Sequence, residues 1–127
     1  MKNILTILIA GILALFFSNQ ISAFDFLDET ESGGVGFMAE AMEHAETAKS
    51  HKAHAKHIQD HAKVSLEYVK KAQIEAIEHG NIKGRNHITA AIQHLVKAIE
   101  HADIGHAHIA SEYVADALEA MRQFMIQ

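Results

Sequence analysis

The fold is decided by residues 84–105, which read GRNHITAAIQHLVKAIEHADIG. Apolar side chains recur here in alternating steps of four and three residues, the spacing that places them on one face of an α-helix. These side chains are Ile88, Ile92, Leu95, Ile99 and Ala102. The pattern predicts an amphipathic helix whose apolar stripe faces a core and which breaks at residues 103–105, where a glycine can adopt a positive φ.

Similar stripes lie on both sides of this helix. The preceding one uses smaller residues, which imply a close approach between helices; it consists of Ile58, Ala62, Ser65, Val69, Ala72 and Ala76, broadened by Leu66 and Ile77. The first stripe of the chain consists of Met38, Ala41 or Met42, Ala45 and Ala48. The last consists of Ala110, Val114, Ala117 or Leu118, Met121 and Phe124 or Met125.

The breaks between helices are unequally marked. Residues 80–84 contain two glycines and an asparagine, which supply the positive φ angles that end a helix. Residues 50–53 contain no glycine, so composition alone would allow one helix over 37–79. An internal repeat indicates a turn at 49–53, because His44 and His51 match His94 and His101 at an offset of 50, and His54 matches His106 at 52.

Short connections between amphipathic helices favour antiparallel neighbours. The sequence therefore predicts an all-α fold, an antiparallel up-down-up-down four-helix bundle over residues 37–127. An extended helical hairpin of dimerising chains is the alternative.

The N-terminal region has the features of an export signal. Residues 1–23 combine Lys2, an apolar run over 4–17 and Ile21-Ser22-Ala23 before a cleavage point. The run is shorter than the roughly 20 residues of a spanning helix, so cleavage is favoured over a membrane anchor. Residues 24–36 are acidic and glycine-containing and are expected to form a flexible leader. We expect a periplasmic protein with one domain and no membrane anchor after cleavage.

Charge and composition restrict the partners. The chain after residue 23 carries ten Lys and Arg against sixteen Asp and Glu, a net charge of −6 that disfavours nucleic acid. No cysteine is present, so disulfides and thiolate metal sites are excluded. The unusual feature is eleven histidines, all after Glu43.

The histidines follow a heptad spacing: His87, His94, His101 and His108 are seven apart, as are His44 and His51, and His54 and His61. His87, His94 and His101 each precede a predicted core position by one residue, so they should face water or a groove. A solvated face has no reason to prefer imidazole over lysine or glutamate, which form helix better. Neutral imidazole is a common ligand of copper, zinc and nickel, so the pattern favours metal binding, with pH sensing as a secondary interpretation.

Histidines seven apart are separated by about 10.5 Å of rise and cannot share an ion, so each needs other partners. One candidate cluster contains His51, His54, His57 and His61 beside Asp60; the other contains His101, Asp103, His106 and His108. Both lie at turns that share one end of the predicted bundle, and this end is the preferred metal site. Weaker candidates are His79 and His87 at the opposite end, with Glu75 and Glu78, and His44, near Glu40, and His94 midway.

Other chemistry is weakly indicated. Met38 with Met42, and Met121 with Met125, are four apart and could offer thioethers to Cu(I), although methionine at helical spacing is usually core. Zincin, haem-attachment and paired Glu-x-x-His motifs are all missing from the sequence, and no activated nucleophile can be named. We therefore expect a binding protein and not an enzyme.

Several stretches resemble the periplasmic small metal-binding protein family: AMEHAE (41–46), DHAKVSL (60–66), HGN (79–81), IQHLVKAIEH (92–101) and GH (105–106). The resemblance implies a monomeric four-helix bundle that binds several copper ions, accepts nickel and zinc, and has no catalytic activity. The matched histidines are His44, His51, His54, His61, His87, His94, His101 and His106. The histidine register departs at Tyr68, Tyr113 and Ala120, which predicts a lower capacity.

Together these features predict periplasmic binding of Cu2+, Ni2+ and Zn2+ by surface histidines, for metal buffering, scavenging or tolerance. The alternative from another class is a helical, chaperone-like interaction module of the envelope, with an exposed apolar groove and a pH-responsive histidine face.

Overall fold

The computed structural model describes residues 32–127. This part of the chain begins with a short 3₁₀ helix, η1 (Ser32–Gly34), and continues with α2 (Val35–Ser50), α3 (Ala55–Glu78), α4 (Gly84–Asp103) and α5 (Ala107–Met125). The expected signal peptide, 1–23, and residues 24–31 of the expected leader lie outside the described residues. Because α2 begins at Val35, the last residues of that expected leader are already helical.

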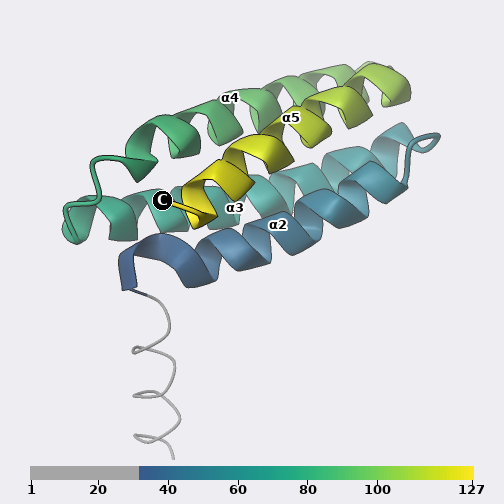
Figure 1. The fold of residues 1–127 in the computed structure, drawn as a ribbon. Coiled ribbons are helices and arrows are strands. Elements are labelled where there is room, and N and C mark those ends of the chain that lie inside the picture. The colour runs from purple at the N-terminus through teal and green to yellow at the C-terminus, as the bar shows by residue number, and fades with distance from the viewer. Residues whose placement is uncertain (1–31) are drawn as a thin grey trace, which may run out of the picture. The chain divides into compact units, whose positions relative to one another are not determined.

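The four α-helices form an antiparallel bundle in which each helix packs against the next one in sequence (Figure 1). α2 also packs against α5, which closes the bundle. The α2–α3 and α4–α5 connections lie at one end, and the α3–α4 connection lies at the other, with the start of α2 and the C-terminus (Figure 1). The predicted four-helix bundle is thus confirmed. Within residues 32–127, no helix has both the length and the hydrophobicity that crossing a membrane requires.

The α2–α3 connection confirms the turn that the internal repeat predicts. α2 ends at Ser50 and α3 begins at Ala55, so residues 37–79 do not form one helix. The His51 amide donates to the Ala48 carbonyl (3.2 Å), and the His54 amide donates to the His51 carbonyl (2.8 Å). These bonds close the turn without a positive φ, which explains why it contains no glycine.

The α3–α4 connection corrects one expectation about its glycines. Gly80 has the expected positive φ of 68°, whereas Asn81 and Gly84 do not have a positive φ. Gly84 is instead buried at the start of α4, where an added Cβ would lie 2.6 Å from the Phe124 ring. Its amide donates to Asn81 Oδ1 (3.0 Å). Gly84 is therefore required by the close approach of α5, and not by the turn.

The core confirms the stripe predicted on α3 and shifts the one on α4. All six small-residue positions of α3 are buried, although Ile77 is 54% exposed and does not broaden the stripe. In α4, Ala91 and Ala98 are fully buried, while Ile92 and Ile99 are partly buried at the edge of the core. Small residues at the centre let the neighbouring helices approach closely, and the larger isoleucines fill the sides of the contact.

Three polar contacts fix the helices relative to one another. The buried Ser65 hydroxyl donates to the Ala41 carbonyl (2.7 Å) and so joins α3 to α2. Arg122 donates to Glu46 (2.6 Å) between α5 and α2. The Gln59 amide donates to Asp103 Oδ1 (2.8 Å), which joins the start of α3 to the end of α4.

Gly34, which precedes α2, gives a prediction about stability. It has φ of 91°, and an added Cβ would lie 2.5 Å from the Ala72 carbonyl oxygen of α3. We expect Gly34→Ala to lower the free energy of unfolding by about 3 kcal/mol, because the left-handed conformation costs roughly 1–2 kcal/mol and the backbone clash adds to it. Gly33→Ala is the matched control, since Gly33 also has a positive φ but has open space around it. Equal losses for both variants in urea denaturation would contradict the packing role of Gly34.

Candidate metal centre

Eight of the eleven histidines lie in two rows of rings, one in each helical hairpin. His44 and His51 come from α2 and its C-cap, and they face His57 and His61 of α3. Each heptad line of histidines lies beside the core stripe, at the edge where the next helix packs. Imidazoles from α2 and α3 interleave there, with His61 between His44 and His51.

The groove between α2 and α3 holds a continuous row of rings, here called the first stack: Phe37, Tyr68, His44, His61, His51, His57 and His54. Within it, the His61 ring lies between those of His44 (6.0 Å between centroids) and His51 (5.8 Å). His57 meets His51 edge to face at 5.0 Å and stacks on His54 at 5.5 Å. Five imidazoles thus form one run from the middle of the hairpin to its turn.

The groove between α4 and α5 holds a shorter row, the second stack: His94, Tyr113, His101 and His106. Tyr113 lies between His94 (6.2 Å) and His101 (5.4 Å), and His101 stacks on His106 (5.8 Å). By the internal repeat Tyr113 occupies the place that His61 has in the first stack. The second stack therefore offers fewer nitrogen ligands.

The ring spacing suits coordination of an ion by imidazoles of the two facing helices. Metal–nitrogen bonds of about 2.0–2.1 Å allow the centroids of two imidazoles on one ion to lie roughly 4.5–6.4 Å apart. The neighbouring histidine pairs in both stacks fall within this range, so rotation of the side chains would be enough to bring two nitrogens onto one ion.

One ring nitrogen of the second stack has no hydrogen-bond partner among the described residues. This atom, His101 Nδ1, is buried. A buried polar atom without a partner is costly unless something completes it. Coordination of a metal ion would do so, and the donor set here consists of the nitrogens that transition metals prefer.

The acidic residues predicted beside the histidine clusters are engaged elsewhere. Lys56 donates a hydrogen bond to Asp60 and thereby lowers the pKa of that carboxyl. Asp103 accepts from Gln59 across the α3–α4 contact. Over residues 32–127, no three or more His, Asp or Glu side chains converge on a point where one ion could sit. The imidazole neighbours that could share an ion in this part of the chain are therefore pairs of rings.

The end of the bundle that carries the first and third turns brings the two predicted clusters near each other, because Gln59 and Asp103 are in contact there. The rings nevertheless pair within each hairpin: His51, His54, His57 and His61 in one, His101 and His106 in the other. His108 is exposed. It borders a small groove of about 150 Å³ that is also lined by Lys49, near the end of α2, and by Lys52 in the α2–α3 turn.

The weaker candidates are more isolated. His79 is exposed at the end of α3, with Nδ1 2.9 Å from the Glu75 carbonyl oxygen. His87 is half-buried on α4. Of the four methionines considered for Cu(I), Met38 and Met121 are fully buried in the core, where they act as packing residues, whereas Met42 is half-buried and Met125 is 37% exposed.

Sequence reasoning missed four residues beside these histidines. Tyr68 and Tyr113 occupy the heptad register, but their place inside the stacks follows only from the structure. Glu112 Oε1 lies 3.3 Å from Nε2 of His108, which precedes it by four residues on α5. Residues four apart on a helix are neighbours, so the sequence could have indicated this pair. Asp116 Oδ2 lies 4.0 Å from His94 Nδ1 on a different helix, so no sequence spacing reveals it.

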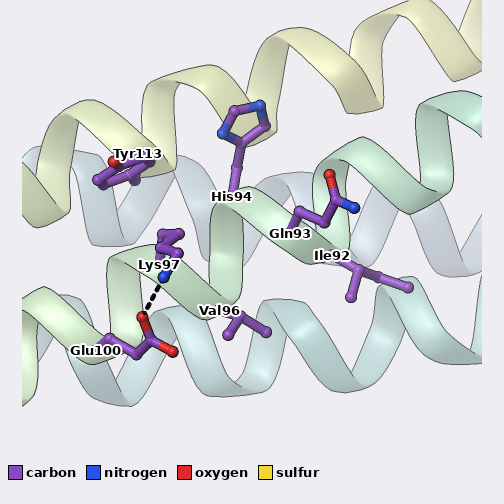
Figure 2. A pocket seen from close by; sticks show the side chains of 7 residues that line it. All are labelled: Ile92, Gln93, His94, Val96, Lys97, Glu100 and Tyr113. Carbon is purple, nitrogen blue, oxygen red and sulfur yellow. Dashed lines mark hydrogen bonds and ion pairs between the residues drawn. The ribbon is translucent and has the colours of Figure 1, made fainter.

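An open groove of about 450 Å³ borders the second stack (Figure 2). It is lined by residues of α4 and by Tyr113 of α5, and Lys97 donates to Glu100 (2.8 Å) at one side. His94 points from α4 toward α5 at the edge of this groove (Figure 2). Solvent can therefore reach the imidazole that lies beside Asp116.

Comparisons with known proteins identify the family of the chain. A comparison with curated proteins gave no match. The family model described as "Small metal-binding protein" matches residues 1–124, nearly the whole chain. With two grooves of paired imidazoles on a four-helix bundle, the chain belongs to the small metal-binding protein family.

Proposed function

We propose that this protein binds divalent transition-metal ions in the periplasm, with copper bound most tightly and nickel and zinc also accepted, and that it buffers or scavenges them. The observation that carries the proposal is the first stack, a row of five imidazoles of α2, α3 and their turn in which each ring lies within ligand-sharing distance of the next. The Irving–Williams order makes Cu(II) the tightest of these ions at nitrogen ligands. The export-like residues 1–23 support the location.

Pairwise coordination favours buffering over permanent structural binding. An ion held by two imidazoles keeps other positions for water, so it can exchange with competing ligands. In the first stack, His44 with His61 and His51 with His57 provide a separate pair for each of two ions. Further ions there would have to share a histidine, and we expect them to bind more weakly.

Calorimetric titration with Cu(II) at pH 7 tests the proposal. We expect saturable heat and a melting temperature raised by about 10 °C or more at 100 times the dissociation constant, because a ligand that binds only the folded state stabilises it. The absence of both effects would overturn the proposal.

The same titration at pH 5 gives a prediction about acid. Free imidazole titrates near pH 6.5 and must be neutral to coordinate, so protons compete with the ion below that pH. For two imidazole ligands we expect the affinity at pH 5 to fall by about 100-fold or more relative to pH 7. An unchanged affinity would show that carboxylates, and not imidazoles, hold the copper.

A further inference from the structure

Apolar side chains gather on the surface at the end of the bundle that carries the α3–α4 connection and the C-terminus (Figure 1). Ile82, in that connection, is 75% exposed, and Ile126, directly after α5, is 74% exposed. The two segments that carry these side chains are in contact, because Gly84 of α4 packs against the Phe124 ring of α5. We call the four exposed apolar side chains of these segments and of the end of α3 the end patch: Ile77, Ile82, Met125 and Ile126.

The size of the end patch indicates a weak and reversible partner. Single exposed hydrophobic side chains are normal, but these four leave roughly 450 Å² of apolar surface open, in the range of the largest patch on a typical monomer, which often has a function. Burial against an identical patch would remove roughly 900 Å² from water, which is less than the about 1,200–2,000 Å² of a stable interface and is typical of transient association.

The charges around the end patch have both signs. Glu78 ends α3, Lys83 ends the connection and Arg85 follows in α4. All three are exposed, and none forms an ion pair with another residue of 32–127. An anionic lipid surface would favour cations alone at this place. A second copy related by a twofold axis can set its Glu78 against the cations of the first and receive the reverse contact, so the surface is complementary to itself.

We propose that two copies of this chain associate end to end through the end patch in a weak, symmetric dimer. The α2–α3 and α4–α5 connections lie at the opposite end of each bundle, so the association leaves the imidazoles of both stacks open (Figure 1). The dimer therefore forms without metal and goes beyond the proposed function. The monomer that the family resemblance implies is the state of the dilute protein.

Sedimentation equilibrium with EDTA at pH 7 tests the dimer. We expect mostly monomer at about 10 µM, mostly dimer at about 1 mM, and a dissociation constant on the order of 100 µM. The double variant Ile82→Gln, Ile126→Gln should raise this constant by about tenfold or more, because each dimer loses four buried apolar side chains. Ile104→Gln is the matched control, since Ile104 is 63% exposed directly after α4, at the other end of the bundle; its dissociation constant should stay within twofold.

Charge reversal tests the symmetry of the contact. Glu78→Lys should weaken the dimer several-fold, because cations of the two copies then face each other, and adding Lys83→Glu to the same chain should recover part of the loss. The absence of this recovery would overturn the symmetric contact.

Other outcomes would overturn the dimer itself. These are a protein that stays monomeric at about 1 mM, and an association that the double isoleucine variant does not weaken. A monomer that binds vesicles of anionic phospholipid, and loses this binding in the double isoleucine variant, would assign the end patch to a membrane surface instead. Calorimetry with Cu(II) on the same variants reports separately on the proposed function, which stands or falls independently of the dimer.

Discussion

Replacing His51 and His61 by asparagine together is expected to lower the affinity for the first Cu(II) ion by on the order of 100-fold at pH 7. His61 contacts both His44 and His51, and His51 contacts both His61 and His57, so the double change leaves no neighbouring imidazoles from opposite helices in the first stack. Loss of an outer-shell partner alone costs 10–100-fold at metal sites, and the removal of direct ligands should cost at least as much. Calorimetry at pH 7 measures the change.

The matched control is His79→Asn, because His79 is exposed at the opposite end of the bundle and its ring contacts none of the others in the described chain. This variant should bind the first Cu(II) ion with an affinity within twofold of that of the unchanged protein. Both variants should unfold without metal within about 1 kcal/mol of the unchanged protein, since substitutions at exposed and half-buried positions away from the core have small effects. A double variant that binds copper normally would remove the first stack from the proposal.

The second large effect concerns the core. Leu95→Ala is expected to lower the free energy of unfolding by about 3 kcal/mol and the melting temperature by about 15 °C. Leu95 is fully buried and is one of few large side chains in a core that is otherwise rich in alanine. Its small neighbours are held by the closely packed helices and cannot expand to fill the space.

Val96→Ala provides the comparison for this change, because Val96 follows directly in α4 but is 37% exposed. It should cost less than about 1 kcal/mol. Both values are measurable by urea denaturation without metal. Equal and small losses in the two variants would indicate that the bundle is loosely packed around Leu95.

The sequence predicted the bundle, a turn at 49–53, which the structure has at 51–54, and the position of the histidines beside the core. Each follows from periodicity within one helix or from the internal repeat. It did not predict that Ala91 and Ala98, and not Ile92 and Ile99, occupy the centre of the α4 contact. Hydrophobicity favours the larger residue, whereas close helix packing favours the smaller one.

The pairing of side chains between helices could not be predicted from the sequence either. The interleaving of His61 between His44 and His51 depends on how far α3 is shifted along α2, which no spacing within either helix specifies. Asp116 meets His94 through the corresponding shift of α5 along α4. Grouping the histidines by turn therefore predicted clusters at one end of the bundle, whereas the rings are ordered in a row along each hairpin.

Each stack joins helices that are consecutive in the chain, and this has a consequence for folding. Contacts of short sequence separation form early, since little loop entropy is lost in closing them. A hairpin of α2 and α3 can thus bring its imidazoles together before α4 and α5 have docked. An ion that binds the paired imidazoles and not the unfolded chain would therefore stabilise this hairpin before the bundle is complete.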